Sequence, residues 1–426
     1  MGDASRVQRE EGRQVSYDVA AVRAHFPALK QGAAHFDGPG GSQVPDVVGD
    51  AVRATLVAAI ANRGRITDAE RTADGTVLAA RRALADLLGA AERGIVFGRS
   101  MTQLTFDFSR TIAKTWQPGD EVVVTRLDHD ANVRPWVYAA QAAGATLRWA
   151  EFDPATGELT PDDVARVLTG RTRLVAVTGA SNLIGTRPDL RAIAGQVHAA
   201  GALFYVDGVH LTAHVPVDAE ALGADLFACS PYKFLGPHCG VVAGRPGLLE
   251  QLHPDKLLPA TDEIPERFEY GTLPYELMAG TTAAIDFLAS LGGDGSRRQR
   301  LVQAMSAIEE HENRLLRRIE EHVRTLPGVT IWSRAQRRTP TLLLTFGRQD
   351  PADAYRFLAS RNVNAPAGSF YALEASRWLG LGDHGGLRIG LAPYSNDDDV
   401  DRLLDGLGQF VRGGPGTGSI PASPGT

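Results

Sequence analysis

Residues 203–210 read Leu-Phe-Tyr-Val-Asp-Gly-Val-His, and residues 225–233 read Asp-Leu-Phe-Ala-Cys-Ser-Pro-Tyr-Lys. Each stretch contains a short apolar run of the kind that is buried in a parallel sheet, followed by polar residues. Asp207 ends the first predicted strand, and Lys233 follows the second. In an open α/β sheet, both side chains would lie at the carboxyl edge, where ligands bind.

An aspartate and a lysine at such an edge suit one chemistry well. The lysine amine can form a Schiff base with an aldehyde cofactor. The carboxylate can keep a pyridine nitrogen protonated, so that the ring withdraws electrons. The alternative is a simple ion pair between Asp207 and Lys233 at the sheet edge.

Further short apolar runs extend this pattern along the chain, with helical patterns between most of them. One helix is predicted to begin at Thr160, because Pro161 and Asp163 follow it as typical first-turn residues. Strands separated by helices imply right-handed crossovers and a largely parallel sheet, so we predict an α/β fold. The runs interpreted as buried parallel strands are residues 95–97, 121–125, 145–150, 174–178, 203–207, 225–229 and 240–243.

The pattern changes after about residue 285. A long amphipathic helix is predicted near residues 300–325, and strands at 329–332 and 341–346 begin smaller α+β units that continue to Val411. The predicted organisation is a large domain and a small domain between two polar ends. Its segments are residues 1–22 (flexible), 23–285 (large domain), 286–412 (small α+β domain, on which the N-terminal residues can pack) and 413–426 (disordered tail).

Composition excludes several classes of protein. The 44 basic and 50 acidic residues argue against a nucleic-acid binder. No apolar run reaches the roughly 20 residues of a membrane helix, and the charged N-terminus does not resemble a secretory signal. The only cysteines, Cys229 and Cys239, exclude a disulfide scaffold and a cysteine-rich zinc site. We therefore expect a cytoplasmic protein with no metal, no membrane partner and no nucleic-acid partner.

Two other functional classes are poorly supported. A cofactor-binding regulator would need an attached DNA-binding module, for which the 20-odd residues before the fold are too few. A nicotinamide enzyme would show a G-x-G-x-x-G turn after its first strand, and no such turn is present.

Two further motifs follow predicted strands in the first half of the chain. Residues 98–102 read Gly-Arg-Ser-Met-Thr and start an amphipathic helix. Backbone N–H groups at such a start form an anion site that would suit a phosphate, although Ser100 or Thr102 could simply cap the helix. His129 follows the strand at 121–125 and could stack on a flat ring or shuttle protons; the alternative is a structural or solvated histidine.

Asn182 and Arg388 complete the set of candidates. Asn182 again follows a strand, and by itself it reads as a turn residue. Arg388 lies inside a predicted strand of the small domain. A bidentate grip on a substrate carboxylate would explain an arginine there, and a bridge to an acid of the large domain is the alternative.

The order of these motifs resembles that of fold-type I pyridoxal 5'-phosphate (PLP) enzymes of the class V aminotransferase family, in its cysteine desulfurase-like branch. The similarity covers about residues 23–412. It implies a PLP-transferase fold, with a mainly parallel seven-stranded sheet in the large domain and a smaller C-terminal α+β domain.

The resemblance also implies roles for individual residues. Lys233 would carry the internal aldimine, Asp207 would pair with the pyridine nitrogen, and His129 would stack on the ring. Asn182 and Arg388 would face the substrate carboxylate, and Asn182 would also contact the cofactor. The remaining residues implied in cofactor binding, the first three at the phosphate, are Met101 (through its backbone), Thr102, Ser230, His210, Tyr232 and Thr272.

Thr272 matches the residue that reaches a phosphate across a dimer interface, so a homodimer is implied.

Three departures from the family pattern bear on the reaction. Family members commonly have Gln at the position of His210, and many desulfurases have His at the position of Tyr232. Desulfurases also receive sulfur on a loop cysteine shortly before the carboxylate-binding arginine. Here residues 364–371 read Asn-Ala-Pro-Ala-Gly-Ser-Phe-Tyr, and no cysteine follows Cys239. A persulfide relay in the usual place is therefore excluded.

The expected enzyme acts on a small amino acid through an external aldimine formed at Lys233. The leading expectation is a desulfurase-like lyase that performs β-elimination or desulfination without a persulfide cysteine. Carbon–carbon bond formation with an aldehyde, and transamination with a ketoacid or epimerisation, are the alternatives. Phe370, Tyr371 and Trp378 could shape a pocket for a larger partner, or could belong to the core of the small domain.

Overall fold

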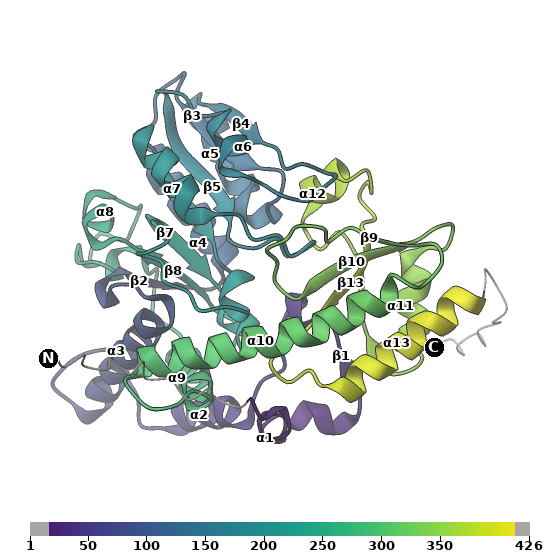
Figure 1. Ribbon diagram of the computed structural model, residues 1–426. Coiled ribbons are helices and arrows are strands. Elements are labelled where there is room, and N and C mark those ends of the chain that lie inside the picture. Colours follow the sequence, from purple (N-terminus) through teal and green to yellow (C-terminus); the bar gives the residue numbers. More distant parts are fainter. Residues whose placement is uncertain (1–16, 414–426) are drawn as a thin grey trace, which may run out of the picture.

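The computed structural model describes residues 17–413 (Figure 1). Residues 1–16 and 414–426 lie outside the described part of the chain. Most of the flexible segment predicted at 1–22, and nearly all of the tail predicted at 413–426, therefore fall on residues whose structure is not described.

Seven strands form the larger sheet, in the order β2-β8-β7-β6-β5-β3-β4. All seven strands predicted from the apolar runs are present, with small shifts at their ends. Their bounds are β2 Ile95–Gly98, β3 Glu121–Thr125, β4 Thr146–Ala150, β5 Thr172–Thr178, β6 Leu203–Asp207, β7 Leu226–Cys229 and β8 Gly240–Gly244. The α/β fold and its seven-stranded sheet are thereby confirmed.

One predicted strand direction is wrong. The neighbouring pairs from β4 to β7 are parallel, but β8 is antiparallel both to β7 and to β2. Between β7 and β8, residues 230–239 contain only the short 3₁₀ turn η6 (Pro231–Lys233). A parallel connection needs a crossover of a dozen or more residues, so this short connection returns the chain in the opposite direction.

Helices cover both faces of the large sheet, and the strands alternate between them. Val122 and Val124 of β3 belong to the cluster that includes residues of α4 (Met101–Ala113) and α5 (Arg134–Ala143). Val123 belongs to the opposite cluster, with residues of α3 (Asp68–Leu88) and α7 (Leu190–Ala199). A strand buried on both faces reads as the continuous apolar run that identified it.

The helix predicted at Thr160 is confirmed as α6 (Pro161–Ala165). The Thr160 hydroxyl accepts the Asp163 N–H, and the Asp163 carboxylate accepts the Thr160 N–H, which is a reciprocal cap.

A second sheet of four antiparallel strands has the order β12-β13-β10-β9. Side chains of its strands pack with those of α10 (Arg297–Val323), α11 (Pro351–Ala359) and α13 (Asp397–Gly413). The four strands are β9 Val329–Ile331, β10 Thr341–Phe346, β12 Ala367–Gly368 and β13 Gly386–Gly390. The long helix predicted near 300–325 and the strands at 329–332 and 341–346 correspond to α10, β9 and β10.

The start of the described chain also reaches this part of the molecule. Strand β1 (Ala34–His35) pairs in parallel with β11 (Val363–Asn364). The predicted domain boundary after residue 285 falls inside α9 (Tyr275–Ser290), and the division into domains stays a prediction.

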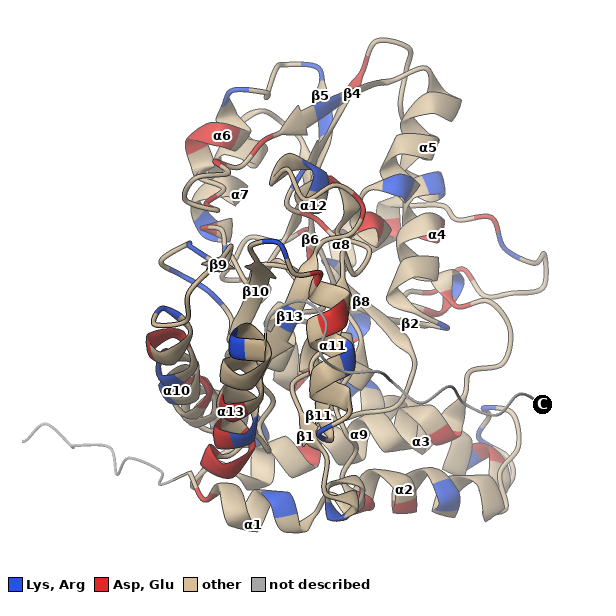
Figure 2. Ribbon diagram, turned by 90° about the vertical axis from the view of Figure 1, so that its right-hand side faces the viewer, with Lys and Arg blue, Asp and Glu red and all other residues tan. Residues whose placement is uncertain are grey.

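Helix α10 connects the two parts. It runs from α3 and α9 to α13 beside the small sheet (Figure 1). Arg314 and Arg318 of α10 form ion pairs with Asp397 at the start of α13. Figure 2 shows acidic and basic residues interspersed along α10, α11 and α13. Within residues 17–413, no helix is long and apolar enough to cross a membrane, and no group of three or more His, Cys, Asp or Glu is placed to hold a metal ion.

Candidate active site

A cavity of about 750 Å³ lies at the carboxyl ends of β5, β6 and β7, and residues from the small sheet close it on the other side. All but one of the site residues predicted from the sequence line it. They are Met101, Thr102, His129, Asn182, Asp207, His210, Ser230, Tyr232, Lys233 and Arg388. The exception is Thr272, which lies exposed before α9 and does not line the cavity.

Lys233 lies in η6, directly after β7, and its amine donates a hydrogen bond to the Pro39 carbonyl. Burial, and after it the positive charge of Arg388, lower the pKa of the Lys233 amine to about 7, although Asp207 opposes both effects. The amine is therefore divided between its charged and neutral forms near neutral pH. Within the described residues no ion pair joins Lys233 to Asp207, so the simple ion-pair interpretation is not supported.

Asp207 is buried at the end of β6. Its Oδ1 accepts the Val209 N–H at 2.9 Å, and no described residue donates to Oδ2. Burial raises the pKa of Asp207 to about 6, although the Val209 N–H and Lys233 favour the carboxylate. Oδ2 is thus available to a donor that enters the cavity, and a cationic donor would lower the pKa again.

His129 lies at the start of the 3₁₀ turn η4 (Asp130–Asn132), with its ring on the cavity wall. Its Nδ1 accepts the Ala131 N–H at 3.0 Å, which leaves the ring proton on Nε2. Burial, with smaller contributions from the positive charges of Lys233 and Arg388, lowers the pKa of His129 to about 4. The imidazole is therefore a neutral, flat surface at physiological pH.

Helix α4 begins at the cavity. Ser100 is the N-cap, and its hydroxyl accepts the Gln103 N–H at 3.1 Å. The capping interpretation is right, but it leaves the first-turn N–H groups of Met101 and Thr102 without intrahelical acceptors. Glycine at 240 allows this close approach of β8 to the helix start, because a Cβ there would lie 2.1 Å from the Ser100 carbonyl carbon. The helix start, with Thr102 and Ser230, fits a phosphate group.

Arg388 is buried in β13, on the opposite side of the cavity. Its Nη1 donates to the Asn182 carbonyl at 2.9 Å, and its Nε is buried without a partner. Asn182 Oδ1 is likewise buried and unpartnered. Burial lowers the pKa of Arg388 to about 9, so the group remains a cation at neutral pH. Arg388 forms no ion pair within residues 17–413, and the predicted alternative of a structural salt bridge is not found.

Residues 370 and 371 close the cavity in an unusual backbone conformation. Phe370 and Tyr371 have φ values of +52° and +59°, in the left-handed region that side chains with a Cβ disfavour. The Phe370 carbonyl accepts from the Asn182 side-chain amide at 2.9 Å, and the Tyr371 carbonyl accepts the Asp130 N–H at 2.7 Å. The Phe370 ring centre lies 3.6 Å from the Arg388 guanidinium carbon. Sequence reasoning named these aromatics but not this conformation.

His210 and Tyr232, the two departures from the family pattern, both line the cavity. His210 Nε2 lies 2.9 Å from the Thr341 hydroxyl and 3.0 Å from that of Thr339, while Nδ1 is buried without a partner. Burial holds the pKa of His210 well below its usual value, with the neighbouring His214 adding to the effect. Tyr232 stacks on His238 at 4.8 Å between ring centres.

Neither cysteine lines the cavity. Cys229 and Cys239 are both buried, and Cys239 contacts the Thr281 hydroxyl at 3.6 Å. Burial raises the pKa of both thiols, that of Cys239 to about 11. Neither thiol is set up as a nucleophile, since the thiolate is the reactive form.

The structure adds residues that the sequence did not indicate, and it removes one. Pro39, which holds the Lys233 amine, lies in the Gly-Pro-Gly turn at residues 38–40, and that composition is the signal that could have drawn attention to it. Phe106 and Tyr138 also line the cavity. Trp378 does not: its indole N–H donates to the Phe152 carbonyl at 2.8 Å, and the ring packs beside the main core.

These residues fit PLP at each of its polar ends. The helix start fits the phosphate, the free Oδ2 of Asp207 fits a protonated ring nitrogen, and Lys233 fits the aldehyde. The flat face of His129 fits the ring itself.

Comparison with known proteins agrees with this chemistry. The aminotransferase class-V family profile matches residues 34–403. An aminotransferase-like protein of Gibberella zeae is 30% identical over 92% of this chain and 98% of its own length. A cysteine desulfurase of Dickeya dadantii is 31% identical over 93% of this chain and 97% of its own length.

Solved structures agree as well. A cysteine desulfurase of Escherichia coli superimposes with a TM-score of 0.82 at 28% identity, covering 93% of this chain and 99% of that one. A cysteine desulfurase of Thermococcus onnurineus, at 24% identity, shares the fold with a TM-score of 0.85 over 92% of this chain and 98% of its own. The chain therefore belongs to the class V aminotransferase family, with cysteine desulfurases among its relatives, and is a PLP-dependent enzyme.

Proposed function

We propose that this enzyme is a desulfurase-like lyase that removes a leaving group from the β-carbon of a small amino acid without transferring it to a cysteine. One observation carries the proposal. The cavity has Lys233 on one wall and the aromatic residues Phe370 and Tyr371 on the other, and both thiols of the chain are buried outside it.

Cofactor binding follows from the cavity lining. Met101, Thr102 and Ser230 would hold the phosphate, Asp207 the pyridine nitrogen, and His129 one face of the ring. PLP bound there supplies an electron sink for charge that develops at the amino-acid Cα.

Arg388 binds and orients the substrate in this proposal. Its unpartnered Nε offers a donor to the substrate carboxylate, and the Asn182 amide lies beside it. Phe370 covers one face of the guanidinium and directs the carboxylate to its edge. A carboxylate fixed at one edge determines which bond at Cα faces the cofactor plane.

Lys233 moves the proton. A pKa near 7 gives an amine that can accept the Cα proton and return it, since general bases work best with a pKa close to the ambient pH. The Pro39 carbonyl accepts from the same amine and would keep it in place when it is free.

L-Cysteine sulfinate is the most informative test substrate. Its carbon–sulfur bond breaks with the electron pair remaining on carbon, a proton replaces the sulfur, and water takes up the sulfur as sulfite. The products are alanine and sulfite, and no protein thiol is needed.

The test compares L-cysteine sulfinate with L-cysteine on the holoenzyme. We expect alanine and sulfite from the first at a higher rate than alanine from the second. Efficient conversion of L-cysteine with sulfur retained on the protein, or no reaction with either compound, would contradict the proposal.

Carbon–carbon bond formation is the second candidate. Phe106, Tyr138, Phe370 and Tyr371 add four aromatic side chains to the lining of the cavity. An apolar aldehyde could pack against these rings and capture the β-carbon. A product that requires both the amino acid and an added aldehyde would favour this reaction over simple release of the leaving group.

Two further assignments belong to this proposal. Thr272 is exposed in the single chain, which suits a role in a neighbouring subunit of a homodimer. Amino-group transfer, suggested by the aminotransferase-like relative, would appear as ketoacid-dependent turnover. The cytoplasmic location stays a prediction.

A further inference from the structure

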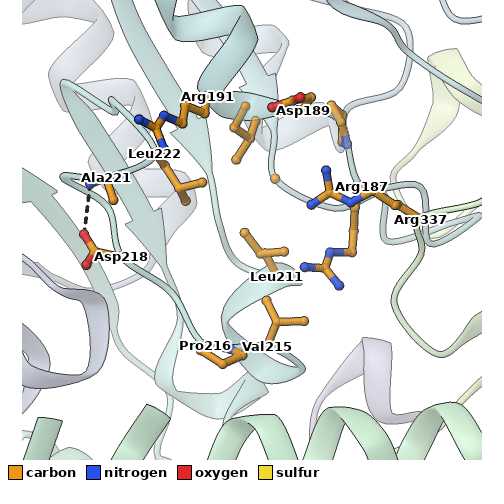
Figure 3. A pocket seen from close by; sticks show the side chains of 13 residues that line it. Arg187, Asp189, Arg191, Leu211, Val215, Pro216, Asp218, Ala221, Leu222 and Arg337 are labelled. Atoms are coloured by element: carbon orange, nitrogen blue, oxygen red, sulfur yellow. Dashed lines mark hydrogen bonds between the residues drawn. The ribbon is translucent and has the colours of Figure 1, made fainter. Parts of the chain in front are cut away.

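A second cavity, of about 310 Å³, lies against segments that also contribute to the active-site wall. Figure 3 shows its lining. Gly179 and Leu211 line this second cavity, whereas their chain neighbours Thr178, Ala180 and His210 line the first. Its volume is at the lower end of the usual range for small-molecule sites.

Three arginines from two segments of the chain line this cavity. Arg187 and Arg191 lie just before and in the first turn of α7, and Arg337 lies in the connection between β9 and β10. Figure 3 shows Arg187 and Arg337 on one side and Arg191 on the other. Like charges repel, so a pocket that gathers three guanidinium groups favours an anion.

The arginines have unused donors. Arg187 Nη1 pairs with Glu309 at 2.6 Å, but its Nε is buried without a partner. In the part of the chain that the structure describes, the guanidinium groups of Arg191 and Arg337 form no hydrogen bond or ion pair.

The two carboxylates beside them are already engaged. Asp189 caps α7 by accepting the Ala192 N–H at 3.2 Å. Asp218 accepts the Ala221 N–H at 2.9 Å and pairs with Arg298 at 3.3 Å. Their existing partners compete with the pocket arginines for these carboxylates.

The rest of the lining is apolar. Leu211, Val215, Pro216 and Leu222 line the pocket together with the arginines (Figure 3). A bare inorganic ion would leave these side chains in contact with water, whereas an anion attached to an apolar group would cover them.

We propose that this pocket binds a small organic anion, in which a phosphate or carboxylate group contacts Arg187 and Arg337 on one side of the pocket and an apolar group contacts Leu211 and Leu222. Arg191, on the other side, adds a third positive charge to the lining. Arg187 offers its free Nε to the anion. The site is separate from the PLP cavity, and the proposal does not depend on which reaction the enzyme catalyses.

Calorimetric titration of the PLP-saturated holoenzyme tests the proposal, with phenyl phosphate, benzoate and inorganic phosphate as probes. We expect one of the aromatic anions to bind, and inorganic phosphate to bind more weakly than phenyl phosphate. The double variant Arg191→Gln/Arg337→Gln should weaken aromatic-anion binding about tenfold or more, because it removes one charge-assisted contact and a second positive charge from the pocket lining. The control Arg317→Gln/Arg348→Gln removes the same charge from exposed arginines outside the pocket and should leave binding unchanged.

The two aromatic probes also distinguish the two possible charged groups. Tighter binding of phenyl phosphate would indicate that the pocket prefers a phosphate, and tighter binding of benzoate would indicate a carboxylate. Absence of binding by both aromatic probes would overturn the proposal. Equal affinities in the wild type and the Arg191→Gln/Arg337→Gln variant would also overturn it, as would an equal loss in both double variants.

Discussion

The two walls of the active-site cavity are built differently. On the large-sheet side, Asp207 ends one regular strand, and Lys233 and His129 follow two others, in ordinary backbone conformations. On the small-sheet side, Arg388 comes from a regular strand, but Phe370 and Tyr371 hold left-handed conformations fixed by Asn182 and Asp130. From this difference we infer two roles. The regular strands position the residues that contact the cofactor, and the constrained loop shapes the space for the substrate.

The largest expected effect belongs to the large-sheet wall. Lys233→Ala should abolish the visible absorption of lysine-bound PLP and lower turnover by about 10²–10⁴-fold or more, because both the attachment point and the proton carrier are lost. Absorption spectra and turnover of the purified variant measure this. Lys30→Ala, at an exposed lysine outside the cavity, is the control. An unchanged spectrum in Lys233→Ala would refute the lysine assignment.

The next effect belongs to the other wall. Arg388→Ala should weaken amino-acid binding by about 2–4 kcal/mol, because a buried cation that contacts the carboxylate is removed. Arg388→Lys should recover only part of this, since an ammonium cannot reproduce the guanidinium fork. Titration of the holoenzyme with amino acid, followed by absorption, gives the affinities. Equal affinity in wild type and Arg388→Ala would return the arginine to a structural role.

The two walls are also coupled electrostatically. The neutral amine of Lys233 is the form that attacks an aldehyde, so the rate of PLP attachment to the apoprotein should rise with pH and level off above about pH 7. Arg388 lowers the pKa of Lys233, and Arg388→Ala should therefore move the midpoint of this rise to higher pH. Stopped-flow absorption measures the rates. A midpoint near the ordinary lysine pKa of about 10.4 in wild type would contradict the account.

The smallest effect concerns the constrained loop. Tyr371 is 76% exposed and has φ +59°, so Tyr371→Gly removes little packing while relieving an unfavourable conformation. The free energy of unfolding should rise by up to about 1 kcal/mol. Tyr355→Gly, at an exposed position in α11, should lower it, because glycine disfavours a helix interior. Denaturant unfolding compares the two variants, and a clear loss of stability in Tyr371→Gly would show that its conformation is not strained.

Much of the large-sheet wall could be predicted from the sequence, because burial on both faces gives each strand a continuous apolar run. The ends of those runs placed Asp207, Lys233 and His129 on one edge. The direction of β8 was predicted wrongly because an apolar run does not indicate whether a strand is parallel or antiparallel to its neighbour. Only the short connection between β7 and β8 indicates the antiparallel arrangement.

The small-sheet wall was less accessible to sequence reasoning. Arg388 could be singled out as a charge inside an apolar strand, but the carbonyl of Pro39 and the backbone angles of Phe370 and Tyr371 depend on contacts distant in sequence. The position of Trp378 could not be predicted for a similar reason. An aromatic residue near a site can belong either to the cavity lining or to the core, and the Trp378 indole N–H donates a hydrogen bond to the Phe152 carbonyl outside the cavity.

The proposed reaction needs no protein thiol, and this can be tested directly because Cys229 and Cys239 are the only cysteines in the sequence. The double variant Cys229→Ala/Cys239→Ala is a cysteine-free enzyme, and its turnover of L-cysteine sulfinate is the measurement to make. We expect turnover within about twofold of wild type once the amount of folded, PLP-loaded protein is matched. Loss of turnover in a variant that keeps its PLP absorption would contradict this expectation and assign a catalytic role to one of the buried thiols.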